Sequence, residues 1–266
     1  MLVAAALAVG LLVGLVSGLT GIGGGVLMVP FLYVLYGRLH VDPQVATSLA
    51  HATSLAVIVP TAIRGLIGFR GSGLVHWRAA VPLAISAALA AAVTAQLATR
   101  LPGPALRAGF GAFLLLVAVD LLLRSSDHDD LPQTGGRHTV AAALLGLPVG
   151  MLSAALGVGG GIPATMGMHY LLRMPFRAIA PTSLAVITVT GAAGSLSYLF
   201  QPAGSLAFGG VVGHVDLLHG LPLAIGAVLA APLGVRLNRG SSALTLRRVF
   251  GVLVLLLGIF LIARNL

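Results

Sequence analysis

The sequence contains no cysteine, no lysine and no glutamate. The absence of cysteine excludes disulfides, thiol catalysis and cysteine-ligated zinc or iron–sulfur sites. Charge is scarce as well: 8% of the 266 residues are charged, against about 25% in an ordinary soluble domain. The basic residues are all Arg and the acids all Asp, which we interpret as codon usage rather than function. The Arg residues are scattered through short loops without a basic tract, which argues against nucleic-acid binding.

The chain is instead rich in apolar residues. Hydrophobic residues make up 58% of the chain and the mean hydropathy is +1.06. Several runs approach the roughly 20 residues that a transmembrane helix needs. We therefore expect an all-α polytopic integral membrane protein of a bacterial or archaeal plasma (inner) membrane, embedded in the lipid bilayer. The first run has neither a basic start nor a cleavage site, so we expect it to be a retained helix.

Two glycine clusters interrupt these runs. They are Gly21-Ile22-Gly23-Gly24-Gly25 and Gly157-Val158-Gly159-Gly160-Gly161. Each glycine costs about 1 kcal/mol relative to alanine inside a helix, so three in a row predict a helix break. A break at membrane depth is tolerated where the freed backbone groups face a cavity or other protein. Breaks at matching places in two halves are typical of a transporter's binding site.

The second half of the chain repeats the first. Val13-Gly14 and Ser17 match Val149-Gly150 and Ser153, and we match Thr47-Ser48-Leu49 with Thr182-Ser183-Leu184. Blocks after Pro82 and after Pro222 match as well. We therefore predict an internal duplication, with a first membrane repeat at 1–124, a polar linker at 125–139 and a second membrane repeat at 140–266.

Each half is expected to contain a glycine-broken helical hairpin and three long transmembrane helices. This gives nominally 8 spans, or up to 10 if the hairpins cross fully. An odd number of crossings per half predicts inverted halves, with both termini outside and the linker in the cytoplasm. A parallel arrangement of the halves stays open.

The order of these motifs resembles the sulfite exporter TauE/SafE family of membrane permeases. The residues that carry the resemblance are the segment from Gly18 to Gly25 with Pro30, the block from Ala46 to Leu49, and their second copies. The loops at 71–77 and 213–216 resemble the turn that precedes the family's next span. The resemblance covers nearly the whole chain. It implies a carrier for sulfite, sulfonates or related organosulfur anions.

The residues themselves suggest an anion site. Amides at the start of a half-helix are unpaired, and the helix dipole places about half a positive charge there. Hydroxyls in the following span of each half can also donate to an anion, although bonding to a helical carbonyl is an alternative. Glycines that only permit close packing remain the alternative for the breaks. The candidate substrate-binding residues are Gly21, Gly23, Gly24, Gly25, Thr47, Ser48, Gly157, Gly159, Gly160, Gly161, Thr182 and Ser183.

His51 is the candidate for proton coupling, because an ionisable side chain within a span is expensive unless it functions. A neutral packing histidine is the alternative. We predict no metal site, since the Asp127–Asp130 segment is better explained as a solvated loop, and we predict no cofactor.

We therefore expect a secondary transporter, either exporter or permease, of small anions. The substrate would bind between the two breaks at the membrane midplane. An anion channel and an intramembrane enzyme are the alternatives. The enzyme would have to use Ser48 and His51 without an orienting acid, so we expect no catalytic residue. Homo-oligomerisation stays open.

Overall fold

The chain folds into a helical bundle. The computed structural model describes residues 2–123, 137–202 and 208–240, together with 251–252, 254–256, 258–259 and 263. Residues 124–136, which include most of the predicted linker (125–139), and most of the last expected span lie outside the described residues. The described part of the first half has the helices α1 (Leu2–Thr20), α2 (Gly25–Arg38), α3 (Pro43–Gly68), α4 (Trp77–Ala98) and α5 (Gly103–Leu123).

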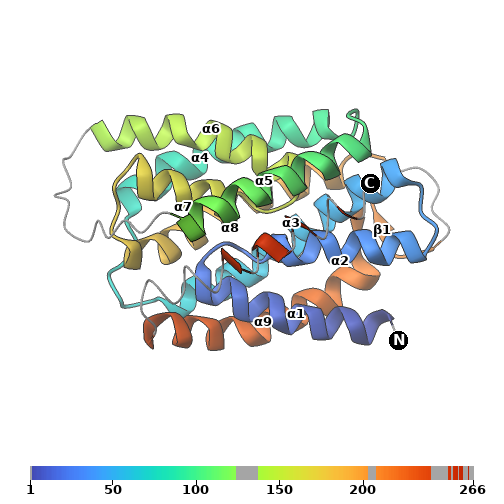
Figure 1. Ribbon diagram of the computed structural model, residues 1–266, viewed down its shortest axis with the longest axis horizontal. Helices are drawn as coiled ribbons and strands as arrows, with labels where there is room; N and C mark the ends of the chain where they lie inside the picture. The colour runs from blue at the N-terminus through green and yellow to red at the C-terminus, as the bar shows by residue number, and fades with distance from the viewer. Residues whose placement is uncertain are drawn as a thin grey trace.

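The second half follows the same order, as Figure 1 shows. Its described elements are α6 (Arg137–Leu156), α7 (Gly161–Tyr170), α8 (Phe176–Leu199), a hairpin of the antiparallel strands β1 (Val211–Val212) and β2 (Val215–Asp216), and α9 (Leu217–Gly240). Within the described residues, six helices are long and apolar enough to cross a membrane, and shorter apolar helices accompany them. The expected all-helical membrane architecture is confirmed.

Local sequence explains where these helices begin. Asp42 caps α3, because its carboxylate accepts from the amides of Gln44 and Val45 at 2.9 and 3.4 Å, and Pro43 occupies the first helical position. In contrast, the N-cap residues of α2 and α7 are Gly24 and Gly160, which are left-handed and offer no side chain for capping. The two half-helices therefore start with bare backbone.

Lipid-facing surfaces are apolar and repeat between the halves. On α4 and on α9, four large side chains at four-residue spacing are exposed, which places each set along one stripe of its helix. The residues are Ile85, Leu89, Val93 and Leu97 on α4, and Ile225, Leu229, Leu233 and Leu237 on α9. Each α9 residue lies 140 positions after its α4 counterpart, so the repeat extends to the outer surface.

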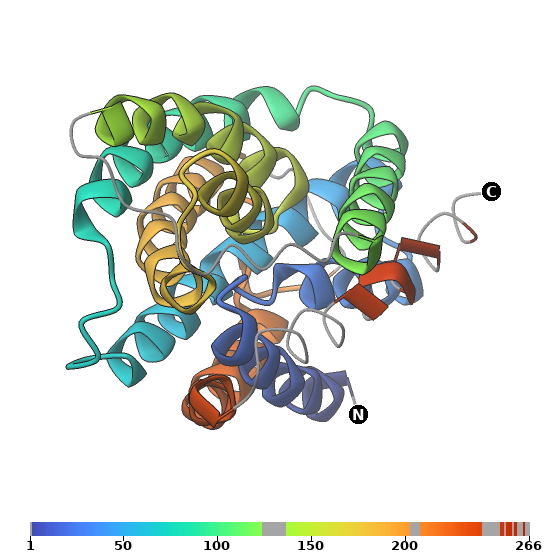
Figure 2. The same cartoon turned by 60° about the vertical axis from the view of Figure 1, so that its left-hand side comes forward.

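The first helix of each half packs against the fourth helix of the other half. On α1, a Cβ added at Gly14 would clash with the backbone of Ala227 in α9. On α6, a Cβ added at Gly150 would clash in the same way with the backbone of Ala87 in α4. Figure 2 shows the α1–α9 pair on one flank of the bundle and the α6–α4 pair on another. Small residues allow this close approach in lipid.

Helices α3 and α8 cross at the centre in opposite directions. Leu184, near the start of α8, lies against Gly65, near the end of α3. Leu55, in the first half of α3, lies against Gly194, near the end of α8. The two contacts are repeat images of each other. We call the end of the bundle where α5 ends and α6 begins the linker end; α1 and α3 begin at the opposite end (Figure 1).

Candidate functional site

The two glycine breaks have the same backbone. Three glycines in each have φ between 68° and 88°, a region that side chains with a Cβ rarely enter. They are Gly21, Gly23, Gly24, Gly157, Gly159 and Gly160. The predicted breaks are therefore present, and each reverses the chain between a long helix and a half-helix.

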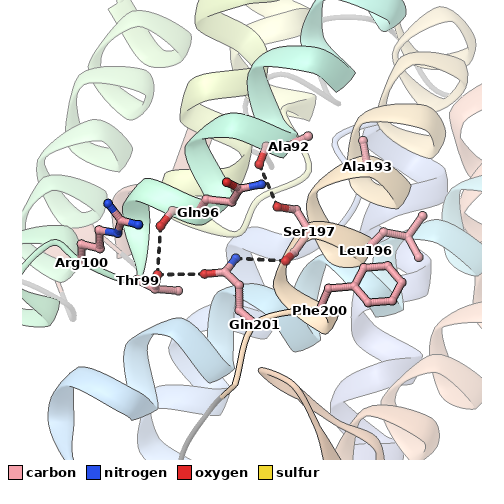
Figure 3. A pocket seen from close by; sticks show the side chains of 9 residues that line it. All are labelled: Ala92, Gln96, Thr99, Arg100, Ala193, Leu196, Ser197, Phe200 and Gln201. Carbon is pink, nitrogen blue, oxygen red and sulfur yellow. Dashed lines mark hydrogen bonds between the residues drawn. The ribbon is translucent and has the colours of Figure 1, made fainter.

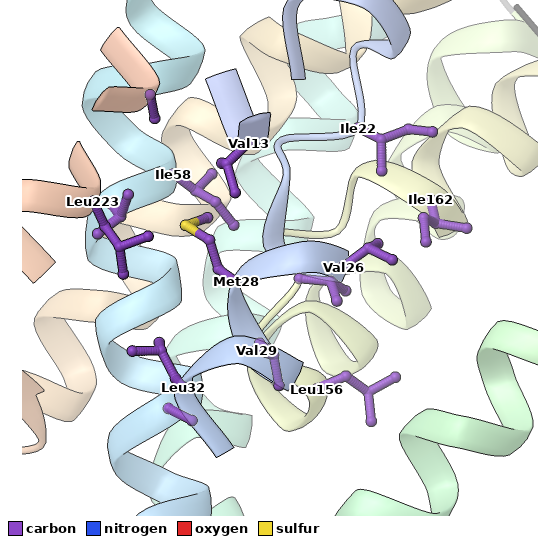
Figure 4. Packing of buried hydrophobic residues seen from close by; sticks show 14 of the residues in the cluster. Val13, Ile22, Val26, Met28, Val29, Leu32, Ile58, Leu156, Ile162 and Leu223 are labelled. Atoms are coloured by element: carbon purple, nitrogen blue, oxygen red, sulfur yellow. The ribbon is translucent and has the colours of Figure 1, made fainter. Parts of the chain in front are cut away.

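The breaks lie against each other at the centre of the bundle. A Cβ added at Gly25 would lie 2.7 Å from the Cα of Val158, and one added at Gly161 would clash with Ile22. Ile58 of α3 and Ile187 of α8 pack on both breaks, close to the middle of their helices. Val13, Ile22, Ile58 and Ile162 belong to one buried apolar cluster (Figure 4). The junction itself is thus filled by hydrocarbon.

This packing changes what glycine substitutions can reveal. A Cβ added at Gly24 would lie 2.5 Å from Cγ1 of Val13, and one at Gly160 would lie 2.9 Å from Cγ1 of Val149. A valine at either position would have to displace protein as well as any ligand. Packing therefore requires glycine at these positions, whether or not the breaks bind a ligand. The backbone amides must be tested through other residues.

Unpaired donors remain at both half-helices. The amides of Gly25 and Val26 in α2, and of Gly161 and Ile162 in α7, make no hydrogen bond to the described residues. They occupy the first turn of each helix, where no carbonyl of the same helix can reach them. All four residues are buried. Each half-helix thus offers donors and the positive end of its dipole.

Four buried serines add hydroxyls that have no hydrogen-bond partner among the described residues. They form two pairs of repeat images, Ser17 with Ser153 and Ser54 with Ser183. Ser17 and Ser153 lie one helical turn before Gly21 and Gly157. Most buried polar groups are paired, because an unpaired hydroxyl costs about 1–3 kcal/mol. A cost repeated at matching positions calls for a functional explanation.

Contacts assign these serines to two groups. A Cβ added at Gly21 would clash with Ala180, which precedes Ser183 by one turn of α8. A Cβ added at Gly157 would lie 2.6 Å from the Cα of His51, which precedes Ser54 by one turn of α3. Each break therefore meets the hydroxyl-bearing helix of the other half. We call the first group subsite A (Gly21 break, Ser17 and Ser183) and the second subsite B (Gly157 break, Ser153 and Ser54).

The structure changes the register in which the two halves match. Oγ1 of Thr182 accepts from the amide of His76 at 3.1 Å. The repeat image of that bond runs from the amide of Asp216 to Oγ1 of Thr53, at 2.9 Å, and does not involve Thr47. Our match of Thr47 with Thr182 is therefore wrong by six residues. The segments 53–58 and 182–187 are both TSLAVI, a signal that was present in the sequence.

Thr47 and Ser48 lie one and a half turns closer to the start of α3. Oγ1 of Thr47 donates to the Pro43 carbonyl at 2.8 Å and accepts from Nε of Arg107 at 2.8 Å. Arg107 also donates to the Pro43 carbonyl, which fastens α5 to α3. Ser48 is buried on the same helix. Of the four predicted hydroxyl residues, Ser183 is the one whose oxygen is buried and has no partner among the described residues.

His51 lies between the second break and α2. Its Nε2 shares a 2.5 Å hydrogen bond with the Tyr33 hydroxyl, and its Nδ1 has no partner among the described residues. The guanidinium of Arg107 lies over the ring of Tyr33, 4.7 Å from its centre. Ala180 occupies the repeat-related position in α8, so subsite B alone has an imidazole.

A pocket between the ends of α4 and α8 differs from the breaks in its hydrogen bonding (Figure 3). Thr99 donates to the side chain of Gln201 at 2.9 Å, and Ser197 donates to the Ala92 carbonyl at 2.7 Å. Gln201 donates in turn to the Ser197 carbonyl at 3.0 Å. These polar groups are paired with one another, so the pocket is a hydrogen-bonded seam between two helices. The described residues contain no group of ligands suited to a metal ion.

Comparison with known proteins gives the same picture. The family described as sulfite exporter TauE/SafE matches residues 6–261. The probable membrane transporter protein YunE of Bacillus subtilis is 24% identical over 269 residues, which cover 95% of this chain and 94% of that protein. A probable membrane transporter protein of Methanocaldococcus jannaschii is 26% identical over 96% of this chain and 93% of that protein. One of Xylella fastidiosa is 28% identical over 96% of this chain and 92% of that protein. No solved structure matches the chain. With almost its whole length matched, the chain belongs to the sulfite exporter TauE/SafE family of integral membrane transporters.

Proposed function

We propose that the protein is a secondary transporter of small anions, with sulfite or an organosulfonate as substrate. The observation that carries this proposal is the repeated set of buried, unpaired serine hydroxyls beside two half-helix N-termini. Both kinds of donor suit the oxygens of a sulfur oxyanion, and the dipoles favour its charge. The family's description supports the proposed substrate class, and the donors and helix dipoles support a negatively charged substrate.

The filled junction suggests two binding positions in place of one. Ser54 precedes Ile58 by four residues, and Ser183 precedes Ile187 by four, which is about 6 Å of helix in each case. Because α3 and α8 run in opposite directions, the two serines lie on opposite sides of the isoleucines. We propose that an anion passes between subsites A and B when one half moves relative to the other. The isoleucines would form the barrier between them.

The opposite directions of α3 and α8 also support inverted halves. Subsite A would face the linker end and subsite B the opposite end. Described Arg residues gather at the linker end, which the positive-inside rule assigns to the cytoplasm. Arg64, Arg70, Arg78, Arg173, Arg177, Arg236 and Arg239 belong to the linker end, and Arg38, Arg100 and Arg107 to the opposite end. We propose that His51 couples a proton to subsite B, where it would bring a positive charge to the anion.

The test uses purified protein in proteoliposomes and ³⁵S-sulfite, with sulfate, thiosulfate and isethionate as competitors. We expect saturable uptake that unlabelled substrate accelerates from the opposite side. Ser54→Ala and Ser183→Ala should each raise the half-saturating sulfite concentration about 10-fold or more, since each removes a hydrogen bond to a charged group. Ser195→Ala is the matched control, because that hydroxyl already donates to the Ala192 carbonyl of α8. Flux that rises linearly with concentration would indicate a channel, and unchanged kinetics in both variants would move the site elsewhere.

A further inference from the structure

A buried carboxylate lies where α2, α3, α9 and the β-hairpin meet, near the end of the bundle opposite the linker. Asp216 is fully buried. Its Oδ2 accepts from the Tyr36 hydroxyl at 3.1 Å and lies 2.7 Å from Nδ1 of His219, and its Oδ1 accepts from the His219 amide at 3.2 Å. An ionisable group in this setting is costly, so it is expected to function.

The surroundings hold the pair in one geometry. The Asp216 amide donates to Oγ1 of Thr53 at 2.9 Å, and that oxygen lies 3.5 Å from the Tyr36 hydroxyl. The ring of Phe208 covers the pair from outside, with its centre 6.2 Å from that of Tyr36 and 5.9 Å from that of His219. Both acceptor oxygens of the carboxylate are therefore occupied by donors.

No guanidinium in the described part of the chain pairs with Asp216. The titratable groups that contact it are Tyr36 from α2 and His219 from α9. His214, two residues earlier in the hairpin, packs against the ring of Tyr198 from α8. Arg107 of α5 lies over the ring of Tyr33, which precedes Tyr36 by one turn of α2. The positive charge that can balance the carboxylate locally is thus a proton on the imidazole of His219.

The repeat-related junction in the other half lacks these side chains. His76 occupies the position of Asp216 and makes the same backbone bond, to Thr182. At 140 positions before His219 stands Ala79, and at 136 after Tyr36 stands Leu172. The helix junction therefore forms in the other half without the acid, the tyrosine or the second histidine. Their presence in one half is explained by something other than architecture.

We propose that the Asp216–His219 pair binds the proton whose movement drives anion transport, which rests on the proposed transport function. The Nε2 of His219 makes no hydrogen bond to the described residues, and it takes up the proton. The pair then changes from one negative charge to none, with Nδ1–H still donating to the carboxylate. On the return step, Nε2 releases the proton to water.

The position of Thr53 connects this pair to subsite B. Thr53 receives the Asp216 amide, and the next residue of the same helix is Ser54. Protonation removes a negative charge beside the helix that carries the anion's hydroxyl ligand. Anion binding and proton binding then strengthen each other by the same factor. His51, at the break itself, would change anion affinity directly, so the two histidines make separable predictions.

The experiment compares two transport modes in proteoliposomes that contain ³⁵S-sulfite and a pH-sensitive dye. Equilibrium exchange needs no net proton movement, whereas accumulation driven by a pH gradient does. We expect both Asp216→Asn and His219→Gln to lose at least ten-fold in accumulation, together with the dye signal. Asp216→Asn fixes the pair without its negative charge and should keep exchange within about two-fold of the wild type, whereas His219→Gln fixes the negative charge and should weaken anion binding in exchange as well. His76→Gln is the matched control and should keep both modes. His51→Gln should weaken anion binding itself, so exchange should fall in this variant, in contrast to Asp216→Asn.

Normal accumulation by a folded Asp216→Asn or His219→Gln protein would overturn the proposal. A second measurement does not depend on transport. The purified protein with ¹⁵N-labelled histidine has eight such residues to follow by NMR across a pH series. A titrating imidazole that disappears in His219→Gln, and shifts its midpoint in Asp216→Asn, supports proton binding; no such signal refutes it. If wild-type protein exchanges none of the tested anions, the proposed function fails, while the NMR result still decides whether the pair binds a proton.

Discussion

Replacing the unpaired serines should separate stability from binding. Ser54 and Ser183 have buried hydroxyls without a partner among the described residues, and such a group costs about 1–3 kcal/mol. Hydrogen bonds within membranes average about 0.6 kcal/mol, so the lower end of that range applies here. Ser→Ala at either position should raise the free energy of unfolding by about 1 kcal/mol. The melting temperature would rise by about 2–4 °C.

Anion affinity should move in the opposite direction. A hydrogen bond to a charged group contributes about 1.5–3 kcal/mol, so its loss weakens sulfite binding by about 10- to 100-fold. A variant that is more stable but binds sulfite more weakly would show that the serine hydroxyl serves ligand binding and not folding. Ser195→Ala should instead lower or preserve the melting temperature and leave affinity unchanged, since its hydroxyl is already bonded.

Both quantities can be measured on the same sample. The chain has one tryptophan, Trp77, whose fluorescence can report unfolding, and thiol-reactive dyes have no target. Labelled sulfite binding to detergent-solubilised protein gives the affinity. If Ser54→Ala and Ser183→Ala lower the melting temperature and bind sulfite normally, the hydroxyls are structural and the reasoning is refuted.

Further substitutions test the packing, the hairpin and the orientation. Gly14→Val should prevent stable assembly, because its side chain meets the α9 backbone, whereas Gly37→Ala meets nothing within 4 Å; size-exclusion profiles will show the difference. Burial lowers the pKa of His214, so folding excludes its protonated form, and stability should fall as pH decreases below about 6.5. His214→Gln should flatten that part of the melting-temperature profile, and an unchanged slope would contradict this. Single cysteines should react with an impermeant thiol reagent on intact cells at Arg38 and not at Arg70; the reverse pattern would invert the orientation.

The sequence was enough to predict the helices and the glycine breaks, but not which residues contact each other in the fold. Glycine clusters predicted the breaks because three left-handed residues cannot continue a helix. The hydroxyl block was matched to the wrong copy, because α3 contains Thr-Ser-Leu at both 47–49 and 53–55. The longer TSLAVI match of 53–58 with 182–187 was available in the sequence, and the bond of Thr53 with the Asp216 amide, the repeat image of that of Thr182 with His76, identifies it as the true copy.

The polar pair at Asp216 was missed for a related reason. A loop of Gly, His, Val and Asp before a span has the composition of an exposed turn. Its burial depends on Tyr36, which lies 180 positions away in the sequence. Long-range burial of this kind leaves no local pattern. Ser17 and Ser153 were matched as repeat images, but the hydrogen bonds that they lack could be recognised only in the folded structure.

The exchange of helices between the halves has a consequence for biosynthesis. The glycine face of α1 is completed by α9, whose last residue is Gly240. At about 5–20 residues per second, a ribosome needs roughly 10–45 s to make the intervening chain. During that interval α1 must remain in the bilayer with its partner surface covered by lipid or a chaperone. Assembly of the first half therefore cannot finish before the second is inserted, and a ribosome that stalls between α5 and α9 leaves a membrane-bound fragment with an open helix-packing face.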